Sequence, residues 1–174
     1  MRLHLECIPC LIRHGFDISA QTADRAVRER FMREILAWAS SLNYDQVPPL
    51  AARDMYAMLR RITGIDDPFA RVKQISNAKA LAMYPCLNSR VTASPDPFDT
   101  ALRIALAGNM IDYGRNAADG LDMDMVVEHF QNVSFARDHR ARLREEVRAA
   151  REVLYILDNA GEIVFDRLFI EEIG

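Results

Sequence analysis

The chain has 174 residues, of which 50% are apolar and 27% are charged. This length and apolar fraction indicate a globular protein with one or two domains and a hydrophobic core. The 22 basic and 25 acidic residues leave a formal net charge of −3, which excludes the strongly basic composition typical of nucleic-acid-binding proteins.

The sequence also lacks the features of membrane and secreted proteins. No apolar stretch approaches the roughly 20 residues that cross a bilayer, and the amino terminus lacks the apolar core of a secretory signal. The three cysteines, an odd number, favour a reducing compartment. We therefore expect a cytoplasmic protein that contacts neither membranes nor nucleic acids.

Helical periodicity dominates the first 95 residues. Apolar side chains at helical spacing predict helices over about 26–42 and 50–63, with Gly64 as the stop of the second. A third helix is predicted over 67–85, from an Asp-Pro start to the breaker Pro85. The apolar stripes and scattered methionines are interpreted as core, and we assign no cofactor to them.

Four metal-ligating side chains near the amino terminus are spaced at helical intervals: His4, Cys7, Cys10 and His14. Pro9 prefers the first turn of a helix, so we expect the helix to begin near residue 8 and His4 to lie outside it. The Cys7–Cys10 spacing suits zinc or a redox dithiol, but a structural zinc site needs a second pair of ligands. Two partly buried structural thiols are the favoured interpretation, and the role of the pair stays open.

A Ser-Pro-Asp-Pro sequence at 94–97 predicts a hinge, because two prolines prevent helix continuation. The apolar run 101–107 that follows suits a buried helix and leads into Gly108 and Asn109. If the helix persists, Asn109 and Asp112 share a face. This polar pair is either a hydrogen-bonded structural contact or part of a site.

The carboxyl-terminal segment carries the strongest functional pattern. An apolar run at 153–157, predicted as a strand, leads through Asp158 and Asn159 into a glycine turn that opens a helix. Ligands bind at the carboxyl ends of parallel strands, and hard cations such as Mg²⁺ or Mn²⁺ accept carboxylate and amide oxygens. The amides after Gly161 would face a bound phosphate. The simpler alternative is that Asp158 only caps the following helix.

A single strand cannot satisfy its own main-chain hydrogen bonds, so at least one further strand is expected beyond residue 174. The chain is therefore expected to be one part of a larger fold.

Five short motifs follow one another along the chain in an order that makes the set specific, although each is weak alone. They are Cys-x-x-Cys at 7–10, Pro-Pro-x-x-x-Arg-Asp at 48–54, Ile-Thr-Gly-x-x-Asp-Pro at 62–68, Gly-Asn-x-Ile-Asp at 108–112 and Asp-Asn-x-Gly-Glu at 158–162. In these motifs the chain resembles the archaeal and bacterial branch of the metal-dependent damage-control phosphatases, a former domain-of-unknown-function family that includes acidic-residue methyltransferase-like proteins.

The resemblance implies an α/β fold, with a helical subdomain at 1–95 followed at 96–174 by the first βα units of a doubly wound sheet, incomplete in this chain. It implies a divalent metal ion (Mn, Mg, Ni or Co) and hydrolysis of small phosphate monoesters, such as sugar phosphates or damaged phosphorylated metabolites. Asp158 and Asn159 would be the catalytic metal ligands. Asn109 and Asp112 would line the same pocket, and Glu162 would support the turn or contact the substrate.

The family pattern also supplies a further metal-binding aspartate and basic phosphate contacts from later strands, which this chain lacks. A non-catalytic helical binding module, or an incomplete subunit completed by another chain, is therefore the alternative function. An unpaired sheet edge at 153–157 would favour a homo-oligomer. The methyltransferase activity proposed within the family ranks below hydrolysis, because the chain has no nucleotide-binding glycine fingerprint.

Overall fold

A computed structural model of the chain describes residues 2–22, 24–109, 128–129 and 131–174. These residues form two compact units, Met1–Phe69 and Ala70–Gly174. No helix in the described part of the chain is long and apolar enough to cross a membrane.

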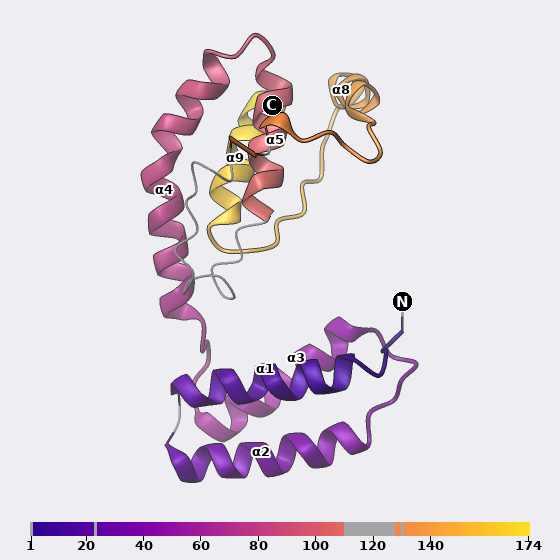
Figure 1. Cartoon of the computed structure of the whole chain (residues 1–174), viewed down its shortest axis with the longest axis vertical. Coiled ribbons are helices and arrows are strands. Elements are labelled where there is room, and N and C mark those ends of the chain that lie inside the picture. The colour runs from indigo at the N-terminus through magenta and orange to yellow at the C-terminus, as the bar shows by residue number, and fades with distance from the viewer. Residues whose placement is uncertain (1, 23, 110–127, 130) are drawn as a thin grey trace. The chain divides into compact units, whose positions relative to one another are not determined.

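The first unit contains three helices, α1 (Cys7–Thr22), α2 (Arg25–Ser40) and α3 (Pro48–Thr63), which pack against one another (Figure 1). Asp24 caps α2 by accepting a hydrogen bond from the amide of Val27 at 2.9 Å, and Gly64 ends α3 in the left-handed region at φ 71°. The predicted helices and the glycine stop are confirmed here. An apolar cluster drawn from all three helices forms the core: Ile18, Phe31, Ile35, Met55, Leu59 and Ile62.

The second unit is built around the pair α5 (Pro97–Asn109) and α9 (Glu162–Ile173), with α4 (Ala70–Thr92) packed against both (Figure 1). The predicted buried helix at 101–107 is α5, and its inward face carries small side chains that allow close packing. The largest side chains of this core that are fully buried are Phe165, Leu87 and Ile104.

Pro85 lies inside α4, so the prediction that this helix ends at residue 85 is wrong. Proline has no amide proton, and α4 therefore lacks the main-chain hydrogen bond to the carbonyl of Leu81. Both residues are exposed, so water can hydrate that carbonyl. Beyond the proline, Leu87 and Val91 are buried in the core, and this burial keeps the last turns of α4 helical.

The predicted α/β fold is wrong for the described residues, which are helical and contain no strand. Residues 153–157 connect α8 (Arg140–Ala149) to α9 without pairing with any other described segment. A strand exists only through hydrogen bonds to a neighbouring strand, and apolar sequence alone does not supply that neighbour. The side chains of Leu154 and Ile156 are accordingly 88% and 83% exposed. The helix predicted after the glycine turn is confirmed as α9.

The proline pair at 94–97 forms a tight turn between α4 and α5. Asp96 accepts a hydrogen bond from the amide of Asp99 at 3.1 Å, and Arg144 of α8 bonds both Asp96 carboxylate oxygens at 2.5 and 2.6 Å. The turn lies inside the second compact unit. The division between the units thus falls before α4, whereas the sequence predicted domains of 1–95 and 96–174.

Gly108 is buried where α5 meets α9. A β-carbon added at this position would lie 2.8 Å from Cβ and 3.1 Å from Cγ of Phe165. Carbon atoms pack best at about 3.5–4.0 Å, and the Phe165 β-carbon is fixed to the main chain of α9. The absence of a side chain at Gly108 therefore lets the two helices approach closely.

Replacing Gly108 with alanine is expected to destabilise the fold. The new methyl group would push α9 away, at an overpacking cost of about 1–3 kcal/mol, which outweighs the gain of about 1 kcal/mol in helix propensity. Urea unfolding of Gly108→Ala measures the change, with Leu106→Ala on the exposed face of α5 as a control. A Gly108→Ala variant as stable as the wild type would contradict this packing.

Candidate functional site

The turn at residues 158–161 opens α9, and its conformation depends on Gly161. This residue is the N-cap of the helix, with φ 86° and ψ −51°, a region in which side chains are strained. Among the described residues, Asp158 accepts its hydrogen bond from Asn159 Nδ2 and none from a main-chain amide of α9. Asp158 therefore does not act as a helix cap, and the simpler alternative for this acid is wrong; its side chain is exposed at the surface of the turn.

The buried carboxylate of Glu162 joins the turn to α5. It is 6% exposed and accepts two hydrogen bonds, from Asn109 Nδ2 to Oε1 at 2.8 Å and from Asn159 Nδ2 to Oε2 at 3.0 Å. A buried carboxylate needs such donors, and its position in the first turn of α9 is also favoured by the helix dipole. Glu162 therefore brings together two of the predicted site residues from segments 50 positions apart in the sequence.

These bonds determine which atom of each amide faces the surroundings. An ionised carboxylate only accepts hydrogen bonds, so the group facing Glu162 must be the amide nitrogen. The nitrogen of Asn159 also donates to Asp158 Oδ2 at 3.1 Å. The Asn159 oxygen is consequently directed away from both carboxylates. This exposed oxygen and the neighbouring Asp158 carboxylate form a donor set that suits a hard divalent cation.

Asn77 of α4 holds the same turn from another side. Its side-chain oxygen accepts a hydrogen bond from the amide of Gly161 at 2.7 Å. Asn77 was not among the predicted site residues, because periodicity does not reveal contacts between residues so far apart. Its signal was an asparagine in the middle of a helical pattern, where this residue type is unfavourable unless its side chain has a specific partner.

The main-chain amides of the turn are engaged within the protein. The Ile163 amide donates to the carbonyl of Asn159 at 3.3 Å, and the Val164 amide donates to the carbonyl of Gly161 at 3.1 Å. The amides of Gly161, Ile163 and Val164 therefore already have acceptors within the protein, and the expected contact between this turn and a phosphate stays a prediction. Asp112, the remaining predicted site residue, lies outside the described residues.

A second buried acid lies one helical turn beyond Glu162. Asp166 is 5% exposed, and its carboxylate accepts a hydrogen bond from the hydroxyl of Tyr155 at 2.8 Å. Burial raises the pKa of Asp166, the nearby charge of Glu162 raises it further, and the tyrosine bond lowers it. The pKa of Tyr155 is also raised, by burial and by its bond to Asp166. Two carboxylates therefore concentrate negative charge at the start of α9.

Comparison with known proteins assigns the chain to a family. The family model named damage-control phosphatase ARMT1-like domain matches residues 3–174 of the sequence. The chain belongs to this family. The resemblance inferred from five short motifs is thereby confirmed over almost the whole sequence.

Two curated members of the damage-control phosphatase family match over 99% of the chain. A damage-control phosphatase from Pyrococcus horikoshii is 30% identical over 177 residues, and one from Archaeoglobus fulgidus is 29% identical over 181 residues. The crystal structure of a DUF89 family protein from Pyrococcus horikoshii superposes with a TM-score of 0.82 at 29% identity and also covers 99% of the chain. The chain spans about 60% of the length of these relatives, 60%, 61% and 60% respectively.

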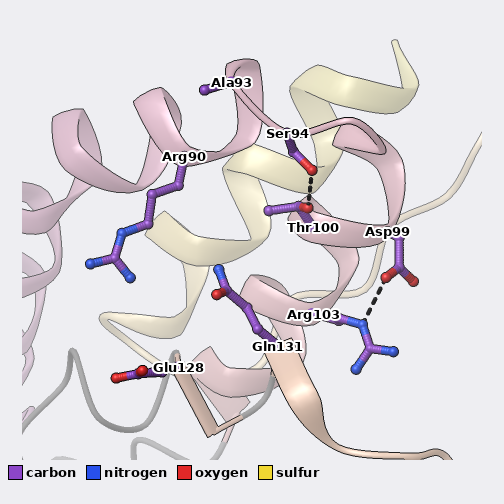
Figure 2. A pocket seen from close by; sticks show the side chains of 8 residues that line it. All are labelled: Arg90, Ala93, Ser94, Asp99, Thr100, Arg103, Glu128 and Gln131. Carbon is purple, nitrogen blue, oxygen red and sulfur yellow. Dashed lines mark hydrogen bonds and ion pairs between the residues drawn. The ribbon is translucent and has the colours of Figure 1, made fainter.

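A pocket of about 570 Å³ lies beside the amino-terminal half of α5, and none of residues 158–162 lines it (Figure 2). Arg103 bonds Asp99 at 2.8 Å, and the hydroxyls of Ser94 and Thr100 are 2.7 Å apart. These groups hold the start of α5 in place, and we assign them no ligand. The described lining residues are Arg90, Ala93, Ser94, Asp99, Thr100, Arg103, Glu128 and Gln131.

The pair Cys7 and Cys10 lies at the start of α1. Cys7 is the first residue of the helix and is half-buried, Cys10 is exposed, and both are free thiols. Among the described residues, no group of three or more His, Cys, Asp or Glu side chains is placed to hold a metal ion. The structure therefore does not assemble the four-residue set that includes His4 and His14.

Asp166→Asn is expected to stabilise the protein at pH 7. Asparagine keeps an oxygen for the Tyr155 hydroxyl but removes a buried charge. The pKa of Asp166 is raised on folding, so the buried, ionised carboxylate lowers the free energy of unfolding of the wild type. This cost is absent below the pKa of about 3.9 in the unfolded state and grows as pH rises through the folded pKa. Urea unfolding between pH 4 and 7 should show the advantage of the variant increasing with pH.

Tyr155→Phe is the matched variant, because it keeps the Asp166 carboxyl and removes its donor. It should lower stability, most strongly at pH 7. An Asp166→Asn variant that is less stable at pH 7, or an effect independent of pH, would contradict the assignment of a destabilising buried charge.

The double variant Cys7→Ser and Cys10→Ser is expected to leave the protein folded and its metal content unchanged, since the two thiols complete no ligand set in the described residues. Elemental analysis of the purified protein and thermal unfolding measure both properties. Loss of bound zinc from the variant would show that the thiols form a metal centre.

Proposed function

We propose that the protein is a metal-dependent phosphatase that hydrolyses small phosphate monoesters, such as sugar phosphates or damaged phosphorylated metabolites. The family assignment and the names of the two curated relatives support phosphatase chemistry. One geometric observation supports the place of that chemistry: the Asn159 amide nitrogen is bonded to Asp158 and Glu162, which directs its oxygen outward.

In this proposal, Asp158 and Asn159 hold a divalent cation, Mn²⁺ or Mg²⁺, through their side-chain oxygens. When bound, such an ion neutralises charge on the phosphoryl oxygens. Glu162 orients the two amides, because each of its oxygens accepts a hydrogen bond from an asparagine nitrogen. Asn109 is held by its own bond to Glu162, with its amide nitrogen toward the carboxylate, and it orients the substrate from the end of α5.

The buried acids add a longer-range effect. Glu162 and Asp166 lie behind the turn and are shielded from solvent, so their charges act through a medium of lower dielectric than water. They favour a cation at the turn and disfavour a bare phosphate. This electrostatic preference supports a substrate that binds together with a metal ion. Small phosphate monoesters bind metal-dependent phosphatases in this way.

Asp158→Ala is expected to lower metal-dependent hydrolysis by about 100-fold or more, because loss of a ligand is expected to be at least as damaging as loss of its supporting partners. Helix content should be unchanged, since Asp158 is exposed and caps no helix. Hydrolysis of an aryl phosphate with and without Mn²⁺, together with far-ultraviolet circular dichroism, makes the test.

Glu152→Ala is the matched control, because Glu152 is also an exposed acid in the segment leading to α9. It should hydrolyse the substrate at the wild-type rate. Retained metal-dependent hydrolysis in Asp158→Ala would reject the proposed site.

A further inference from the structure

Asn77 satisfies a main-chain group that α9 itself cannot satisfy. Gly161 is buried, and as the N-cap it has no carbonyl within α9 to which its amide can donate. A buried amide without an acceptor is unfavourable, and Asn77 Oδ1 supplies that acceptor at 2.7 Å. The bond therefore fixes the one residue of the turn whose left-handed conformation is essential to its shape.

The helix that carries Asn77 is held firmly against α9. Tyr84, two helical turns further along α4, donates its hydroxyl to Glu171, and the Arg167 guanidinium lies over the Tyr84 ring at 4.8 Å from its centroid. Ser76 and Ala80, on the buried face of α4, are 2% and 0% exposed. Asn77 thus projects from a packed helix whose position relative to α9 is determined by several other contacts.

We propose that Asn77 is a positioning residue for the candidate metal site, an inference that rests on the proposed function. Gly161 is two residues from Asn159 and three from Asp158, so the anchor at its amide sets where both oxygens lie. Loss of this anchor allows the turn to shift while the core of α4, α5 and α9 stays packed. A metal site is sensitive to such a shift, because supporting bonds typically change affinity by 10–100-fold.

Two variants of similar size separate the hydrogen bond from the shape of the side chain. Asn77→Leu fills the same space without an acceptor, whereas Asn77→Asp keeps an oxygen that accepts the Gly161 amide. We expect Asn77→Leu to raise the dissociation constant for Mn²⁺ by about tenfold or more. Asn77→Asp should bind within threefold of the wild type or more tightly, since its added charge favours a cation. Electron paramagnetic resonance of free Mn²⁺ during titration measures binding without reference to activity.

A second measurement covers the case in which the leucine variant fails to fold. Asn77→Ser is polar but too short to reach the Gly161 amide, and it is expected to weaken Mn²⁺ binding in the same direction. Faster hydrogen exchange of the Gly161 amide in either variant would report directly on the lost bond. Folded variants that bind Mn²⁺ with wild-type affinity would overturn the positioning role.

Titration of Asp158→Ala with Mn²⁺ in parallel separates the role of Asn77 from the existence of the metal site. If this variant loses Mn²⁺ binding while Asn77→Leu keeps it, only the role of Asn77 is wrong. If Asp158→Ala binds Mn²⁺ as the wild type does, the proposed metal site is wrong, and the role of Asn77 falls with it.

Discussion

The close approach of α5 to α9 at Gly108 determines where the polar groups of the candidate site lie. Because Gly108 has no side chain against Phe165, the next residue of α5, Asn109, reaches the first turn of α9 and bonds Glu162. That bond helps to satisfy a carboxylate that is almost fully buried. Glu162 in turn orients Asn159. The packing of α5 against α9 thus determines, through Glu162, where the side-chain oxygens of Asp158 and Asn159 lie at the surface.

Part of the site could be predicted from the sequence, because it depends on residues that are close together in the chain. An acid and an amide before a glycine, followed by an apolar helix, predicted the turn at 158–161 and the helix α9. The motif order predicted the family, which the match over residues 3–174 confirms. These features depend on residues within a few positions of one another, where side-chain type and main-chain conformation are directly linked.

The features that the sequence did not predict depend on partners distant in the chain. The periodicity of the sequence does not identify Asn77, because its side chain accepts the Gly161 amide only when α4 packs beside the turn. Pro85 stays helical because burial beyond it outweighs one missing hydrogen bond. Residues 153–157 have strand-like composition, but a strand is a property of a pair, and the described residues supply no partner. Each of these differences depends on whether residues distant in the sequence are in contact.

The central claim is that Asp158 and Asn159 present oxygens to a divalent cation, and its location is best tested by diffraction. Crystals of the protein soaked in Mn²⁺ should show an anomalous peak at the manganese edge, about 2.0–2.6 Å from the Asp158 carboxylate and from the Asn159 oxygen. Asn159 should keep its nitrogen toward Glu162. An anomalous peak elsewhere, or an Asn159 amide turned with its nitrogen toward the metal, would contradict the account.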